Sequence, residues 1–140
     1  MIPIIFINCK GQPFVDQIMA GTKEYETRTR NTLGRLNGER VLIAETGYGR
    51  PLVRCSARID YYYALFSREQ WEEVKPYRHS FRCLSHIDSG SPYDWQPDTK
   101  VKYLYHLTDV RPVKPFRAPE GRRHGRVWME YEGGWRSVYS

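Results

Sequence analysis

The sequence predicts one α+β domain of five to six mostly antiparallel strands with short flanking helices. Apolar and polar residues alternate over residues 52–61 and again over 101–107, as they do in half-buried strands. Helix-start signals occur at Pro13 and at Ser67. The 140 residues contain no internal repeat or low-complexity linker, so residues 1–140 are interpreted as a single domain.

The N-terminal part is expected to form a strand, a short helix and a second strand. Residues 1–7 are apolar but lack a basic leader, which favours a first strand over a signal peptide. Residues 12–21 read as a helix, because Pro13 suits its first turn and Gly21 suits a left-handed C-terminal cap. In residues 23–30, charged side chains alternate with the β-branched and aromatic residues typical of strands.

The middle of the chain continues with two strands and a helix. Residues 40–44 form a short apolar run that predicts a buried strand, and residues 52–61 predict a half-buried antiparallel strand. The next helix begins at Ser67, which forms a capping-box pattern with Gln70. Pro76 is expected to stop this helix.

The remaining elements are a long loop and two strands. Residues 77–99 lose the periodic pattern and are rich in turn residues. Long ordered loops are often binding loops, so we expect Tyr93 and Trp95 on a mobile loop near a ligand cleft. Strands are expected at residues 101–107 and 126–131.

Bulk composition narrows the class of partner. Lys and Arg number 22 against 16 Asp and Glu, and the resulting net charge of +6 favours polyanionic partners. No apolar run is long enough to predict a membrane span, so no membrane partner is expected. Cys9, Cys55 and Cys83 are scattered and odd in number, which indicates reduced thiols in a cytoplasmic protein.

The charged strand is the first candidate site. Side chains alternate along a strand, so Glu26, Arg28 and Arg30 are expected on one face. Lys23 follows the Gly21 turn and is expected to point over a cleft. Two cations beside a carboxylate suit a phosphate, a polarised carbonyl or a nucleobase edge. The alternative is a solvated edge strand whose charges block aggregation.

A glycine-containing turn at residues 46–50 is the second candidate. Thr46 and the backbone amides of this turn can approach a ligand, and the ring of Tyr48 can stack on a base. The alternative is an ordinary hairpin turn of the kind that glycine favours.

The strongest local charge bias lies in residues 111–126, which hold six basic residues against Glu120. Basic segments with neighbouring aromatic residues suit single-stranded nucleic acid, and the alternative is a solubilising loop. The candidate contacts here are Arg122, Arg123, Arg126 and the nearby Trp128.

Metal and cofactor chemistry is not predicted. His79, Cys83 and His86 are loosely spaced on one segment, but zinc sites usually show clearer pairing of ligands. The sequence also has no phosphate-binding loop and no dinucleotide glycine fingerprint. We therefore expect no metal and no cofactor.

The order of these elements resembles the ASCH family, which has a PUA-like β-barrel fold. The family hallmark Gly-x-Lys-x-x-Glu-x-Arg is matched by Gly21, Lys23, Glu26 and Arg28. The resemblance spans most of the chain, because further positions also fit: Gly38, residues 103–105, residues 115–116, Gly125 and Trp128.

The resemblance implies binding of single-stranded RNA or a modified nucleoside or nucleotide, in a cleft lined by Lys23, Glu26, Arg28 and residues 46–48. Two alternatives remain open, a hydrolase of the same fold and a protein-interaction module with a basic face. Amidohydrolases of the family use a Thr nucleophile where this chain has Glu26, which disfavours amide hydrolysis. A ribonuclease would need a Lys, a Tyr and a Ser, for which Lys23, Tyr25 and Ser56 are the candidates.

Overall fold

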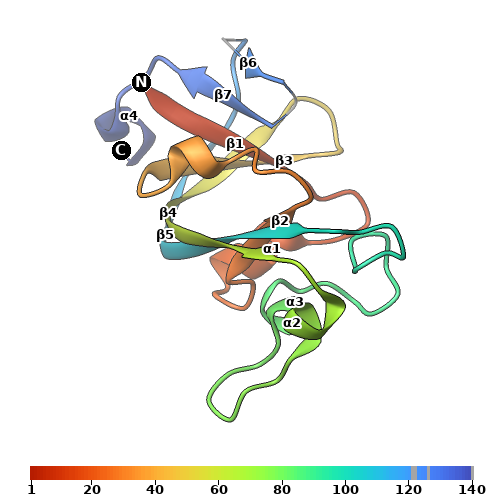
Figure 1. The fold of residues 1–140 in the computed structure, drawn as a ribbon. Coiled ribbons are helices and arrows are strands. Elements are labelled where there is room, and N and C mark those ends of the chain that lie inside the picture. The colour runs from red at the N-terminus through yellow and green to blue at the C-terminus, as the bar shows by residue number, and fades with distance from the viewer. Residues whose placement is uncertain (121–122, 126, 140) are drawn as a thin grey trace.

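The computed structural model describes residues 1–120, 123–125 and 127–139. Within these residues, seven strands form one curled mixed sheet in the order β2-β5-β4-β3-β1-β7-β6 (Figure 1). The strands are β1 (Ile2–Asn8), β2 (Tyr25–Arg28), β3 (Arg40–Thr46), β4 (Leu52–Leu65), β5 (Lys102–Arg117), β6 (Arg123–His124) and β7 (Trp128–Tyr131). The helical segments are α1 (Phe14–Met19), the 3-10 turn η1 (Gly34–Leu36), α2 (Arg68–Glu72), α3 (Phe81–Leu84) and α4 (Trp135–Tyr139). This half-barrel confirms the predicted α+β class.

The sheet curls because its two longest strands are irregular. β4 and β5 pair antiparallel with three shifts of register, between Val53 and Cys55, Ser56 and Arg58, and Ile59 and Tyr62. Such bulges bend a strand and increase its twist. The only parallel pair in the described sheet is β1 with β3, so the expectation of a mostly antiparallel sheet is confirmed.

An arginine joins the edge strand β2 to β1 across the open side of the half-barrel. The β1–β7 pairing ends at Ile5 opposite Trp128, which leaves the carbonyl of Phe6 available at this edge. Arg28 Nη2 on β2 donates a hydrogen bond of 2.7 Å to the Phe6 carbonyl oxygen. This contact places the end of β1 beside the charged strand.

Both faces of the sheet are buried. One core lies between the sheet and the helices α1, α2 and α3, and includes Ile5, Val15 and Trp71. A smaller core on the opposite face includes Ile4, Phe6 and Val138 of α4. Figure 1 shows α2 and α3 together at one end of the molecule and α4 at the other. None of the helices in the described ranges is long and apolar enough to cross a membrane.

Most predicted elements are present. The inward face of β4 is confirmed, since Val53, Cys55 and Ile59 are buried, but Ser56 on the opposite face is also fully buried because Tyr139 of α4 bonds to it. The predicted cap of α2 is confirmed, because Ser67 Oγ accepts a hydrogen bond from the Gln70 amide at 3.2 Å. The Gln70 side-chain oxygen in turn accepts from the amide of Phe66, one residue before the N-cap, at 2.7 Å, so the return bond is displaced by one residue from that of a regular capping box.

Several boundaries differ from the prediction. β2 is only four residues long, and α3 lies inside the segment predicted as a structureless loop. The basic residues 111–117 belong to β5, because β4 supplies a pairing partner as far as Leu52 opposite Arg117. Pro112 and Pro115 are tolerated there because β2 pairs only with the first part of β5, which leaves this stretch at a sheet edge. α4 was not predicted.

Candidate functional site

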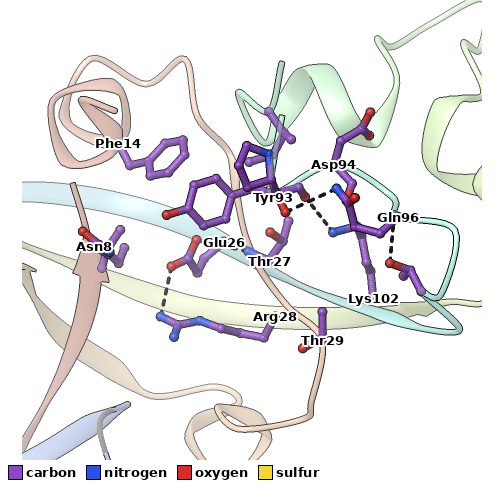
Figure 2. A pocket seen from close by; sticks show the side chains of 14 residues that line it. Asn8, Phe14, Glu26, Thr27, Arg28, Thr29, Tyr93, Asp94, Gln96 and Lys102 are labelled. Carbon is purple, nitrogen blue, oxygen red and sulfur yellow. Dashed lines mark hydrogen bonds and ion pairs between the residues drawn. The ribbon is translucent and has the colours of Figure 1, made fainter. Parts of the chain in front are cut away.

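A cleft of about 280 Å³ lies between β2 and the loop of residues 87–99 (Figure 2). β2 contributes Glu26 and Arg28, and the loop contributes Tyr93. The end of β1 contributes Asn8, and α1 contributes Phe14. The cleft therefore collects side chains from four segments that are separate in the sequence.

The carboxylate of Glu26 is fixed in this cleft by three neighbours. Arg28 Nη2 donates to Oε2 at 3.0 Å, and the backbone amide of Thr27 donates to Oε1 at 3.1 Å. The ammonium nitrogen of Lys23 lies 3.8 Å from Oε1. Glu26 is only 6% exposed, so these contacts compensate a nearly buried negative charge. The predicted grouping of Glu26 with two cations is therefore present.

Lys23 does not point over the cleft, so that expectation is wrong. Its side chain is 0% exposed, and Nζ donates a hydrogen bond of 2.5 Å to the carbonyl oxygen of Ser85. Nζ also lies 4.5 Å from the centre of the Phe14 ring. Lys23 thus contacts Glu26 and Phe14, which line the cleft, but does not line the cleft itself.

The local backbone explains this inward direction. Gly21 takes the left-handed φ of 80° that was predicted for the end of α1. The amide of Lys23 then bonds to the Gln17 carbonyl at 3.1 Å, and the amide of Glu24 bonds to the Leu84 carbonyl at 2.7 Å. The segment that follows α3 therefore covers the lysine.

Burial dominates the ionisation of Lys23. Loss of hydration lowers its pKa, Glu26 raises it, and Arg28 lowers it, so that the net pKa is about 8. The ammonium thus gives up its proton more readily than that of an exposed lysine. Its charge still opposes that of Glu26 at neutral pH.

The loop opposite β2 is anchored by a buried carboxylate. Asp94 Oδ1 accepts hydrogen bonds from Trp71 Nε1 at 2.7 Å and from the Trp95 amide at 2.8 Å. Its Oδ2 accepts from the Gly90 amide at 2.8 Å. Burial raises the pKa of Asp94, but these three hydrogen bonds outweigh it and hold the pKa below its ordinary value.

The two aromatic residues of this loop have different environments. Tyr93 is 39% exposed and lines the cleft, as predicted, with its ring edge-on to Phe14 at 5.6 Å. Trp95 is only 8% exposed and belongs to the core, so its expected exposure on the loop is wrong. The reason is that Asp94 ties the loop to Trp71 of α2, which draws the neighbouring Trp95 inward.

Asn8 is a cleft residue that the sequence analysis missed. Its Oδ1 accepts a hydrogen bond from the Lys10 amide at 2.9 Å, which leaves the amide nitrogen as the free donor. The only sequence signal was a polar residue at the end of an apolar strand. Thr46 pairs with Asn8 in the parallel β1–β3 register, so Thr46 adjoins the cleft without lining it.

The glycine turn supports the Asn8 end of the cleft. Gly47 has a φ of 110°, and a Cβ built there would lie 3.0 Å from Asn8 Oδ1 and 2.9 Å from Lys10 Cβ. Glycine is therefore required for this close approach. Tyr48 is 67% exposed and does not line the cleft.

Tyr25 and Ser56 are not brought into the cleft. Tyr25 belongs to the main core and packs on the His106 ring at 4.8 Å. Ser56 is fully buried and bonds to Arg40 at 2.9 Å and to Tyr139 of α4 at 2.5 Å. The Lys, Tyr and Ser candidates for a ribonuclease site therefore do not line one cleft.

The basic C-terminal candidates lie elsewhere. Arg123 is exposed, with its guanidinium carbon 4.7 Å from the centre of the Phe6 ring. Trp128 is 8% exposed and stacks on His124 at 3.9 Å. Arg122 and Arg126 lie outside the described residues.

The histidine- and cysteine-containing segment lines a second pocket of about 420 Å³ beside α3. His79, Cys83 and His86 all contribute to it. Within the described ranges, no group of three or more His, Cys, Asp or Glu residues is placed to hold a metal ion.

The half-barrel with this cleft has the fold of the ASCH domain. The crystal structure of ASCH from Zymomonas mobilis superposes with a TM-score of 0.64 at 18% identity, over 82% of this chain and 72% of that one. Two variants of that protein, one with a serine replaced by alanine and one with a tyrosine replaced by phenylalanine, superpose with TM-scores of 0.60 at 20% identity. Each alignment covers 82% of this chain. It covers 72% of the serine-to-alanine variant and 74% of the tyrosine-to-phenylalanine variant. No protein-family model and no curated protein matches the sequence. The fold implied by the ASCH resemblance is thus confirmed.

Proposed function

We propose that the protein binds single-stranded RNA or a modified nucleoside or nucleotide, and that the cleft receives a base. The observation that supports this most strongly is the fixed carboxylate of Glu26 facing the same cleft as the half-exposed ring of Tyr93. Proteins read unstacked bases through hydrogen bonds to their edges and through stacking on aromatic rings. One rigid acceptor and one aromatic ring are the minimum set for that purpose.

The same geometry argues against a phosphate at the centre of the cleft. Lys23 does not reach the cleft, and Arg28 Nη2 is already bonded to Glu26 and to the Phe6 carbonyl. Lys102 Nζ, which also lines the cleft, donates to the Tyr93 carbonyl at 2.8 Å. A phosphate in the cleft would therefore lie against the Glu26 carboxylate and compete with these existing bonds for the cations. We assign phosphate contacts to exposed basic residues outside the cleft, such as Lys114 and Arg123.

Fluorescence anisotropy with a labelled single-stranded RNA tests this proposal. If three or four phosphates are neutralised, affinity should fall roughly ten- to a hundredfold between about 50 and about 200 mM salt. Tyr93→Ala should weaken binding by about fivefold or more, since stacking of one base contributes about 1–3 kcal/mol. Tyr48→Ala is the matched control, because Tyr48 is an exposed tyrosine outside the cleft. A titration without binding at low salt would refute the proposal.

A hydrolase is the second candidate, and one observation favours it. The pKa of Lys23 is lowered to about 8, and its ammonium lies 3.8 Å from the Glu26 carboxylate that lines the cleft. In a hydrolysis, Glu26 would take a proton from the attacking water molecule, and Lys23 would hold the Glu26 carboxylate in position. Incubation with RNA and a panel of modified nucleosides, read by mass spectrometry, separates retention from turnover.

A further inference from the structure

We infer that the cleft selects guanine by its Watson–Crick edge, an inference that rests on the proposed binding of a base. The cleft of about 280 Å³ is slightly smaller than the usual small-molecule sites, whose volumes begin near about 300 Å³. It therefore suits one planar base rather than two. The choice among the bases then depends on the hydrogen-bonding groups that face the cleft.

The acceptor in the cleft is the Glu26 carboxylate. A carboxylate offers about four lone-pair positions and, when ionised, no donor. The Thr27 amide and Arg28 Nη2 each use one position, one on each oxygen, and the Lys23 ammonium lies at a longer ion-pair distance of 3.8 Å from Oε1. Both oxygens therefore retain capacity for a further donor. Because the carboxylate is held on both sides, its direction is set before a ligand arrives.

The donor beside it is Asn8. Its Oδ1 accepts from the Lys10 amide at 2.9 Å, and we assign its amide nitrogen, a donor of two hydrogens, to the ligand. Figure 2 shows Asn8 and Glu26 at the same end of the cleft, with the Tyr93 ring next to them. The site thus offers one donor followed by a two-oxygen acceptor, beside an aromatic ring.

Guanine is the base whose edge complements this order. Its Watson–Crick edge presents the O6 acceptor, then the N1–H and N2–H donors. The amide of Asn8 matches O6, and the two oxygens of Glu26 match the N1 and N2 donors. The pair of parallel hydrogen bonds to a carboxylate is the arrangement that gives both strength and direction.

The other bases match less well. Uracil presents one N–H between two carbonyl oxygens, which the carboxylate repels. Adenine presents one amino donor beside the N1 acceptor, and cytosine presents one amino donor beside the N3 acceptor. A good bidentate pair therefore discriminates in favour of guanine by about ten- to a hundredfold.

Isothermal titration calorimetry with nucleoside monophosphates tests the inference on the unmodified protein. Guanosine monophosphate should bind most tightly of the four common nucleotides. Inosine monophosphate lacks the N2 amino group and should lose about fivefold or more in affinity, and the 1-methylguanosine analogue should lose about tenfold or more. All of these probes carry the same phosphate, so only the base edge differs.

The protein variants Glu26→Gln and Glu24→Gln provide the reciprocal test. Both changes remove one negative charge, but Glu24 lines the second pocket and not the cleft. Glu26→Gln should abolish most of the preference for guanosine monophosphate, while Glu24→Gln should keep it. If Glu26→Gln fails to fold, the nucleotide series on the wild type still decides the inference.

The outcomes separate this inference from the proposed function. Binding of all four nucleotides within about threefold of one another would overturn guanine selection and leave base binding in place. Tighter binding of cytidine monophosphate, or full affinity for the 1-methylguanosine analogue, would also overturn it. If neither RNA nor any nucleotide binds, the proposed function and this inference both fail.

Discussion

Lys23→Ala should strongly destabilise the protein, because the lysine is part of the interior. Its ammonium donates to the Ser85 carbonyl at 2.5 Å, and its side chain is 0% exposed. Truncation to alanine leaves that carbonyl without its donor and the Glu26 carboxylate with one cation fewer. The sequence predicted a lysine that points over a cleft, and truncation of such an exposed side chain should change stability little, so this variant separates the exposed placement from the buried one.

The magnitude follows from the groups that are removed. The variant loses three buried methylene groups, worth about 0.8 kcal/mol each. It also loses a charged hydrogen bond, worth about 1.5–3 kcal/mol. The variant no longer bears the cost of dehydrating a buried ammonium, which offsets part of this sum. We therefore expect the free energy of unfolding to fall by about 3–4 kcal/mol, near the range for breaking a buried ion pair. In a domain of this size, the melting temperature should fall by about 6–16 °C.

Thermal denaturation followed by circular dichroism measures this change. Lys23→Met keeps most of the apolar side chain and should recover about half of the loss, since only the charged contacts are missing. Lys100→Ala removes an exposed lysine and should change stability by less than about 0.5 kcal/mol. If Lys23→Ala melts within about 2 °C of the wild type, the structural role assigned to Lys23 is wrong.

Three further outcomes are expected. Burial lowers the pKa of Lys23 from 10.5 to about 8, so the unfolded chain binds the proton more tightly between these values. The free energy of unfolding of the wild type should therefore rise relative to Lys23→Met over this pH range, as measured by urea denaturation. The pKa of Asp94 is held below its ordinary value by its hydrogen bonds despite burial, so its contribution to stability should be lost as pH falls through that lowered pKa. Asp94→Asn should be less stable at neutral pH and less sensitive to acid than the wild type in the same assay. Ser67→Ala should cost about 1 kcal/mol, because the Ser67 hydroxyl caps α2, and an unchanged urea midpoint would contradict this.

Local signals in the sequence were sufficient for most elements. Gly21 could be assigned to the end of α1, and Ser67 to the start of α2, because caps depend on residues within one helical turn. The alternation of β4 was readable because each face of a strand has its own environment. These features depend on neighbours in the sequence, so they needed no knowledge of the fold.

Features that depend on distant partners could not be read in this way. The direction of Lys23 depends on Ser85, which is 62 residues away. The extension of β5 beyond residue 107 depends on pairing with β4, although its basic residues and prolines favour a loop. Asn8 carries no local mark of a binding residue, because its place in the cleft depends on β2 lying beside β1.

Arg28 explains how the position of the cleft carboxylate is coupled to the position of Asn8. The same Nη2 atom donates to Glu26 at 3.0 Å and to the Phe6 carbonyl at 2.7 Å, so it links β2 to β1 through the carboxylate itself. Asn8 lies on β1 only two residues after Phe6, so this guanidinium ties Glu26 to the strand that carries Asn8. Both hydrogens of this nitrogen lie in the plane of the guanidinium, which gives the two bonds fixed directions, whereas the donors of a lysine ammonium rotate freely. The two cations of the motif thus hold the carboxylate in place, and Glu26 and Asn8 are the residues to which we assign the proposed hydrogen bonds with a base.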